Sequence, residues 1–147
     1  MIAVATYIEE VKPGWRNFDK FILMNLQYVF SYDVHYYIAQ NERDRTWFYR
    51  QNFLGEHRLV VTAAEIKSRS GSMHYVNVQP PNVFHRQEVV ELHEFKHPDN
   101  CCYIFGPNHG VIETVGGLNV LIPLDKSSLY ASSAVAMVLY DRKAKRG

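Results

Sequence analysis

The stretch SSLYASSAVAMVLYD, residues 127–141, decides how this sequence is interpreted. It opens with small hydroxyl residues, which are favoured helix N-caps, and continues as an apolar run suited to a buried helix. Directly before it, NVLIPLDK (residues 119–126) has the composition of a buried strand that ends at a proline. We therefore expect a strand, a loop and a helix from Ser128 to Arg142.

A second strand exit of the same kind lies upstream. CCYIFG (residues 101–106) is almost continuously apolar, and Pro107 and Gly110 follow it. Glycine permits positive φ and lets a ligand approach the backbone closely, whereas Pro123 fixes φ and holds its neighbouring peptide groups in place. Ligands of parallel sheets bind beyond the carboxyl ends of the strands. We expect a site at these two exits, although a tight turn without a ligand would explain the glycine loop alone.

The rest of the chain alternates strand-like and helix-like segments. Their composition predicts strands at 1–8, 33–40, 58–63, 74–78, 101–106 and 118–124, helices at 17–30 (capped by Asn17), 43–54, 87–95 and 128–142, and no helix running through 66–82. The strands are apolar along their whole length rather than alternating. The sequence therefore predicts an α/β fold with a mostly parallel sheet and helices on both faces, in a single domain covering residues 1–147.

Composition and charge limit the function classes only loosely. Of the 147 residues, 47% are hydrophobic and 21% are charged, as in a globular domain. The formal net charge of +1 gives no general nucleic-acid signal. Two local basic clusters are present, one formed by Arg43, Arg45 and Arg50 and the other by residues 143–146. Each is either a solvated surface or a contact with nucleic acid.

The sequence contains no pattern that indicates a metal site, a disulfide or a membrane span. Cys101 and Cys102 are adjacent and lack the C-x-x-C spacing of a zinc site, so we interpret them as buried strand residues. His93 and His97 have helical spacing but no H-E-x-x-H pattern, and we expect no metal. No apolar run approaches the roughly 20 residues of a membrane span, and no signal peptide is recognisable. We expect a cytoplasmic protein that does not enter membranes.

The two exits and the last helix together carry a specific resemblance. FGPNHG (residues 105–110), IPL (residues 122–124) and SSLYASSAVAMVLYD resemble, in this order, the SpoU branch of the SPOUT RNA methyltransferases. That family has a strand leading to G-x-E-x-x-G-L, then I-P, then S-L-N-x-S and a small-residue helix that ends in Tyr and an acidic residue. The resemblance is strong over residues 101–141 and weak over the N-terminal portion.

The resemblance implies a fold, a cofactor and a reaction. The family fold threads the C-terminal segment through a loop to form a deep trefoil knot, and S-adenosylmethionine binds in the knot mainly through main-chain groups. Family members are usually homodimers that methylate a ribose 2′-hydroxyl of tRNA or rRNA. The cofactor-binding residues that the resemblance implies are Phe105, Gly106, Pro107, Asn108, Gly110, Leu121, Ile122, Pro123, Leu124, Ser128, Leu129 and Ala131.

Three positions depart from the family pattern. The arginine of the first helix aligns with Asn25, and Arg16 lies nearby but out of register. The acidic residue of the glycine loop is Asn108, and the asparagine of S-L-N is Tyr130. The positions that the resemblance places at the methyl-transfer site, or that could replace its missing groups, are Ser128, Tyr130, Asn25, Arg16 and His109.

These observations leave three hypotheses. The first is an S-adenosylmethionine-dependent RNA methyltransferase, acting on the ribose 2′-hydroxyl as a homodimer. The second is a catalytically degenerate SPOUT-fold homodimer that acts as an RNA- or protein-binding module, because the three departures affect the chemistry more than the fold. The third is an unrelated α/β domain that matches by chance.

Overall fold

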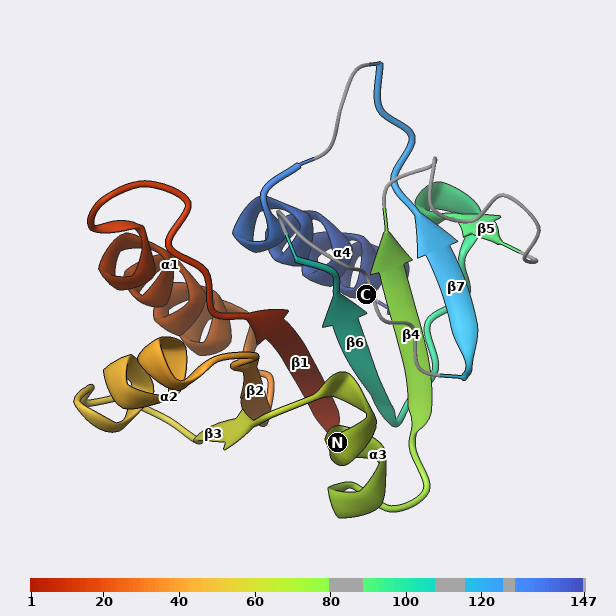
Figure 1. Cartoon of the computed structure of the whole chain (residues 1–147). Coiled ribbons are helices and arrows are strands. Elements are labelled where there is room, and N and C mark those ends of the chain that lie inside the picture. Colours follow the sequence, from red (N-terminus) through yellow and green to blue (C-terminus); the bar gives the residue numbers. More distant parts are fainter. Residues whose placement is uncertain (80–88, 108–115, 126–128, 147) are drawn as a thin grey trace.

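The computed structural model describes residues 1–79, 89–107, 116–125 and 129–146, which form a seven-stranded sheet in the order β3-β2-β1-β6-β4-β7-β5 (Figure 1). Every pair of neighbouring strands is parallel. The strands are β1 (Ile2–Tyr7), β2 (Val34–Ile38), β3 (His57–Val60), β4 (His74–Gln79), β5 (Val90–Glu91), β6 (Cys101–Phe105) and β7 (Leu118–Leu121). The helices are α1 (Trp15–Phe30), α2 (Glu42–Tyr49), α3 (Ala63–Arg69), α4 (Ala131–Arg146) and the short 3₁₀ helix η2 (Leu92–Glu94).

The central strands are buried on both faces, as their continuous apolar sequences predict. On β1, Val4 belongs to the core that includes Leu23 of α1 and Val135 of α4. Its neighbour Ala3 belongs to the opposite core, which includes Ile66 of α3. Figure 1 shows α4 behind the central strands and α3 on the other side of the sheet. The expected α/β architecture with a parallel sheet and helices on both faces is therefore confirmed.

Helix α1 begins before the predicted cap. Gly14 has the left-handed conformation (φ 83°) at the N-cap position and provides no side-chain cap, so the prediction of Asn17 as the cap is wrong. Asn17 lies inside the first turn, where its Oδ1 accepts a hydrogen bond from Trp47 Nε1 of α2 at 3.1 Å. The residue therefore ties two helices together instead of starting one.

Helix α3 occupies part of the segment 66–82, through which no helix was expected. Thr62 Oγ1 accepts from the backbone N–H of Glu65 at 3.3 Å, and Glu65 Oε1 accepts from the N–H of Val61 at 3.3 Å. These reciprocal bonds resemble a capping box, a start signal that the sequence contains as Thr-x-x-Glu. The side chain of Ile66 is fully buried under the sheet.

The predicted helix over 87–95 is wrong in the described part. Val90 and Glu91 form β5, which pairs in parallel with β7 at the sheet edge, and η2 follows at once. An edge strand needs only a partner with free peptide groups, which β7 supplies, and a β-branched valine suits it. The last helix begins at Ala131 rather than Ser128 and continues to Arg146.

Helix α4 is fixed to the segment before β6 by buried polar contacts. His97 bridges Tyr103 (Nδ1 to the hydroxyl, 2.7 Å) and Asp141 of α4 (Nε2 to Oδ2, 2.7 Å). Arg142 donates to the Tyr103 hydroxyl at 2.9 Å and to the carbonyl of Pro98 at 2.6 Å. The two ends of this network are more than forty residues apart in sequence, so it fixes α4 in place along its second half.

Two further expectations concern the course of the chain. The knot would involve residues 108–115 and 126–128, which lie outside the described ranges, and it stays a prediction. Within the described ranges, no helix is both long and apolar enough to cross a lipid bilayer.

Candidate functional site

The two strand exits that the sequence indicates lie at the carboxyl end of the parallel sheet. Phe105 of β6 and Val120 of β7 both pair with Val78 of β4, so the three residues stand at the same level. Strand β4 separates the two exits, which places them about 10 Å apart, or two strand spacings. Gly106 directly follows β6 and Ile122 directly follows β7, so the two residues lie on either side of the end of β4.

The two exits form an apolar floor bordered by peptide groups. The side chains of Phe105 and Ile122 are buried, Gly106 and Pro107 are partly buried, and Pro123 is exposed. Pairing with β4 ends at Phe105 on β6 and at Leu121 on β7. The peptide groups beyond these residues are therefore not needed by the sheet. The polar edge of a planar heterocycle needs such donors and acceptors.

The remaining cofactor positions divide into two groups. Leu124 and Leu129 are partly buried, and Ala131 is buried at the first turn of α4. Asn108, Gly110, Ser128 and His109 lie outside the described residues. Their predicted roles at the cofactor and the acceptor hydroxyl stay predictions.

The start of α4 packs directly against the start of α1. The ring centroids of Tyr130 and Trp15 lie 4.8 Å apart at an interplanar angle of 45°. One turn further along α1, Asp19 accepts a hydrogen bond from the side chain of Ser132 in the first turn of α4. The structure thus brings Tyr130 next to the first turn of α1, which carries Arg16.

Asp19 is a polar group that sequence reasoning missed. Burial raises its pKa to about 6; the hydrogen bond from Ser132 opposes this shift and the charge of Glu9 adds to it. A carboxyl group that titrates near neutral pH suits proton transfer. A sequence signal existed: Trp15, Asp19 and Leu23 recur at four-residue spacing, which puts an acid on the inner stripe of an amphipathic helix.

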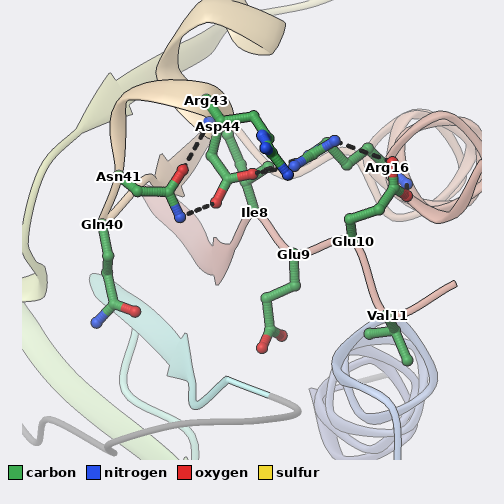
Figure 2. A pocket seen from close by; sticks show the side chains of 9 residues that line it. All are labelled: Ile8, Glu9, Glu10, Val11, Arg16, Gln40, Asn41, Arg43 and Asp44. Carbon is green, nitrogen blue, oxygen red and sulfur yellow. Dashed lines mark hydrogen bonds and ion pairs between the residues drawn. The ribbon is translucent and has the colours of Figure 1, made fainter. Parts of the chain in front are cut away.

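A cavity of about 510 Å³ opens beyond the carboxyl ends of β1 and β2 (Figure 2). Its lining residues are Ile8, Glu9, Glu10, Val11, Arg16, Gln40, Asn41, Arg43 and Asp44. Because β1 lies directly beside β6 in the sheet, the cavity is one strand away from the Gly106 exit. The carboxyl end of the sheet therefore has two neighbouring parts, an apolar floor and a polar cavity.

Arg16 forms one wall of this cavity and is held by two carboxylates. Its Nε donates to Asp44 Oδ1 at 2.8 Å, and its Nη1 donates to Glu10 Oε2 at 2.9 Å (Figure 2). The side chains are largely buried, with 13% of Arg16 and 7% of Asp44 exposed. Asn41 caps α2 by accepting from the N–H of Asp44 at 2.9 Å and donates to Asp44 Oδ2 at 2.8 Å. The guanidinium group is therefore charge-compensated within its own chain.

Asn25 lies elsewhere on α1. Its exposed side chain borders a different cavity, together with Ser31, Asp33 and Glu56 at the amino end of β2. Nine residues separate it from Arg16, which corresponds to about 14 Å along a helix. The structure does not bring Asn25 together with Arg16 and Tyr130, and its role at the methyl-transfer site stays a prediction.

The cysteines are strand residues, as predicted. Cys101 and Cys102 are buried in β6, and burial raises the pKa of both thiols. A raised pKa lowers the thiolate population, so neither thiol is a strong nucleophile at neutral pH. In the described part of the chain, no group of three His, Cys, Asp or Glu residues is arranged to hold a metal ion.

Comparison with known proteins finds similarity in structure only. No family model and no curated protein sequence matches the chain at a significant level. Solved structures do match, among them the SpoU methyltransferase AviRb from Streptomyces viridochromogenes in complex with the cofactor AdoMet (14% identity, TM-score 0.64), an AdoMet-bound rRNA methyltransferase from Sinorhizobium meliloti (11%, 0.62) and an RNA 2′-O ribose methyltransferase (15%, 0.62).

The matches extend over nearly the whole chain but only part of each neighbour. They cover 99%, 98% and 99% of this chain, and 59%, 55% and 56% of the three neighbours. The chain thus spans little more than half the length of the proteins it resembles. The TM-scores of 0.62–0.64 over nearly the whole chain argue against an unrelated architecture that matches by chance. The chain has the fold of the SpoU methyltransferases, the SPOUT branch that its sequence resembles.

Proposed function

We propose that this protein is an S-adenosylmethionine-dependent RNA methyltransferase that modifies a ribose 2′-hydroxyl of tRNA or rRNA in the cytoplasm. The observation that carries the proposal is the pair of strand exits on either side of β4, in a fold shared with AdoMet-bound methyltransferases. The neighbour described as an RNA 2′-O ribose methyltransferase supports the choice of acceptor.

The two exits suit S-adenosylmethionine through their main chain. Peptide groups of Gly106, Pro107 and Leu121–Leu124 would face the edges of the adenine ring, while the buried side chains of Phe105 and Ile122 would hold the two loops against the core. Leu129 and Ala131 would close the slot at the start of α4, with Asn108, Gly110 and Ser128 completing it. When bound, the cofactor would supply an electrophilic methyl group, while the protein supplies binding and orientation.

The acceptor hydroxyl needs a group that takes its proton. A ribose hydroxyl is a weak nucleophile until a base accepts that proton. We propose the carboxylate of Asp19 for this role, because it lies one helical turn from Trp15, whose ring contacts Tyr130, and accepts a hydrogen bond from Ser132 at the start of α4. Burial also raises its pKa to about 6, which suits proton transfer. Tyr130, Ser128 and Arg16 would position the acceptor around it, with Arg16 acting through the loop that Glu10 anchors.

Homodimer formation is part of the proposal. Helix α1 carries an exposed apolar stripe of Phe18, Phe21 and Tyr28, the last with 85% of its side chain exposed. Met137 and Tyr140 continue this surface on α4, which packs beside α1. An apolar patch on two adjacent helices is typical of a protein interface. We expect a dimer by analytical ultracentrifugation and a monomer for Phe21→Glu, with Lys12→Gln, which also lowers the net charge by one, as the charge-matched control.

The second hypothesis, a binding module without catalysis, has its own supporting observation. Arg16 is neutralised by two carboxylates, and an aromatic ring at position 130 occupies the place of an amide. Both features leave the fold intact while reducing the groups available for chemistry. Under this alternative the homodimer binds RNA or protein and leaves it unmodified.

Two measurements separate the hypotheses. Calorimetry with S-adenosylmethionine and S-adenosylhomocysteine should give micromolar binding, on the order of −8 kcal/mol. Tritiated methyl transfer to total tRNA and rRNA, followed by nuclease digestion and mass spectrometry, should identify a 2′-O-methylnucleoside. A folded dimer that binds neither cofactor form would overturn the proposal, and cofactor binding without methyl transfer would favour the binding module.

A further inference from the structure

The arginines of the described residues fall into three groups. Four have a carboxylate within 4.0 Å, namely Arg16, Arg58, Arg69 and Arg146. Arg142 is buried, and its guanidinium donates to the main chain and to Tyr103. The others are Arg43, Arg45 and Arg50, for which the described structure contains no ion pair, and all three lie on α2 or directly after it.

The acids of α2 leave these charges uncompensated. Asp44 points inward, where both of its oxygens are used by Arg16 and Asn41. Arg45 is held by a hydrogen bond from its Nη1 to the carbonyl of Ala39 at 3.1 Å, which fixes the group without neutralising it. Glu42 is the other acid of the helix. The segment of α2 and Arg50 therefore carries a net positive charge although the whole chain is almost neutral.

The helical spacing of α2 places two of these arginines on the same face. Arg43 and Arg50 are seven residues apart, so they lie on the same helix face about 10 Å from each other. Between them along the chain, Tyr49 has 75% of its side chain exposed. Its ring stands edge-on to Phe48 with centroids 6.0 Å apart, and Phe48 packs against the main core.

The surface continues into the candidate site. Arg43 also lines the cavity beyond β1 and β2, where it stands near the Arg16–Asp44 pair (Figure 2). The hydrogen bond from Trp47 to Asn17 fixes α2 against α1 and so fixes the orientation of the arginine side. An extended polyanion bound along α2 would thus lead toward the carboxyl end of the sheet, where we place methyl transfer.

We propose that the side of α2 that carries Arg43 and Arg50, with the exposed ring of Tyr49 at its border, binds a single-stranded segment of the RNA substrate. Guanidinium groups bind phosphates with two parallel hydrogen bonds, and an exposed tyrosine offers a flat face for an unstacked base. Helical RNA keeps its bases stacked inside the duplex, so Tyr49 has a function only with an unpaired strand. The choice of RNA over other polyanions rests on the proposed function.

Fluorescence anisotropy of the full chain tests the proposal. A short labelled single-stranded RNA of mixed sequence would be titrated over a range of salt concentrations. For Arg43→Gln/Arg50→Gln we expect affinity to fall about tenfold or more, and the slope of log affinity against log salt to decrease by about 1.4, two phosphate contacts at about 0.7 each. Tyr49→Ala should weaken binding without changing the slope, because stacking releases no counterions.

Matched controls make the outcome specific. Lys96→Gln/Lys67→Gln removes the same charge from exposed side chains away from α2 and should change affinity less than twofold. An equal loss in this control, tighter binding of a duplex of the same sequence, or no binding by the wild-type chain would each overturn the inference. Cofactor calorimetry on the same variants separates the two proposals: failure to bind S-adenosylmethionine counts against the proposed function, whereas RNA binding that ignores α2 counts against this inference alone.

Discussion

The ring of Trp15 packs against the ring of Tyr130 with their centroids 4.8 Å apart, and this contact joins the start of α1 to the start of α4. Strand β1 leads into one of these helices and strand β7 into the other. The contact therefore connects the polar cavity to the residues proposed to hold the cofactor. Two segments more than a hundred residues apart in sequence depend on each other here.

Substitution at Tyr130 should separate packing from chemistry. We expect Tyr130→Ala to lower the free energy of unfolding by about 1–2 kcal/mol, because an aromatic pair contributes beyond its buried area. Tyr130→Phe should stay within about 0.5 kcal/mol of the wild type, since the ring contact is kept. Urea unfolding measures both variants. A loss of methyl transfer in Tyr130→Phe at unchanged stability would assign a chemical role to the hydroxyl.

Removal of the Arg16 side chain should destabilise the fold. Arg16→Met leaves the carboxylate of Asp44 buried without its cation, and we expect a loss of about 3 kcal/mol. Adding Asp44→Asn should recover part of that loss, because the uncompensated charge disappears. Arg58→Gln is the control: its ion pair with Glu56 is exposed, so the change should be below about 0.5 kcal/mol. Equal effects of Arg16→Met and the control in urea unfolding would contradict the interpretation of Arg16 as a buried anchor.

Asp19 should give the fold a measurable pH dependence. Its pKa is about 6 in the folded protein and 3.8 in the reference state, so between these values the folded chain holds the proton more tightly. Stability should therefore decrease as the pH rises through this range, by about 1–3 kcal/mol. Asp19→Asn should remove this decrease, and Glu42→Gln, an exposed change, should not. The check is urea unfolding at a series of pH values; a profile unaltered by Asp19→Asn would show that the carboxyl is not perturbed.

His97 should act in the opposite sense. Burial lowers its pKa below the ordinary value of 6.5, although the hydrogen bond to Asp141 works against this. The unfolded chain then takes up a proton first as the solution is acidified, so stability should fall as the pH drops below 6.5. His97→Gln should flatten this part of the profile, whereas the exposed His93→Gln should leave it unchanged. Thermal unfolding between neutral and mildly acidic pH provides the measurement.

Gly117 should tolerate no side chain. Its φ of +154° lies in a region that glycine favours, and a Cβ there would stand 2.3 Å from the carbonyl oxygen of Tyr75. Because that oxygen belongs to the backbone of β4, relief would require β7 to move. We expect Gly117→Ala to cost about 3 kcal/mol or more. Gly71→Ala is a useful comparison, since its φ is also positive but its added Cβ meets open space; a similar cost at both sites would point to backbone conformation alone.

The sequence predicted the sheet well because its strands carry an unambiguous signal. The five residues of β2 and of β6 are all buried, and both were recognised from continuous apolar composition. The helix signals were less reliable. Helix α3 has seven residues, too few for a clear period, and its Thr62–Glu65 start was overlooked. Residues 90–91 were predicted as helix, yet their conformation follows from pairing with β7, a contact that local sequence does not encode.

The candidate site was predictable only in part, for a related reason. Glycine and proline mark the ends of β6 and β7 within a few residues, so those positions could be read locally. The pairing of Arg16 with Asp44 joins residues 28 positions apart, and the bond between Asp19 and Ser132 joins two helices at opposite ends of the chain. No periodicity or spacing reveals such pairs. They depend on the order in which the strands assemble.

The strand order also determines when the chain can fold during its synthesis. Strand β6 fits between β1 and β4, both of which leave the ribosome earlier. Until residue 105 has emerged, the nascent polypeptide holds two β-strand edges with no partner between them, and such edges invite aggregation. An N-terminal fragment that stops at β4 lacks the middle of its own sheet. Stable structure must therefore form late in translation, when more than two thirds of the sequence is already available.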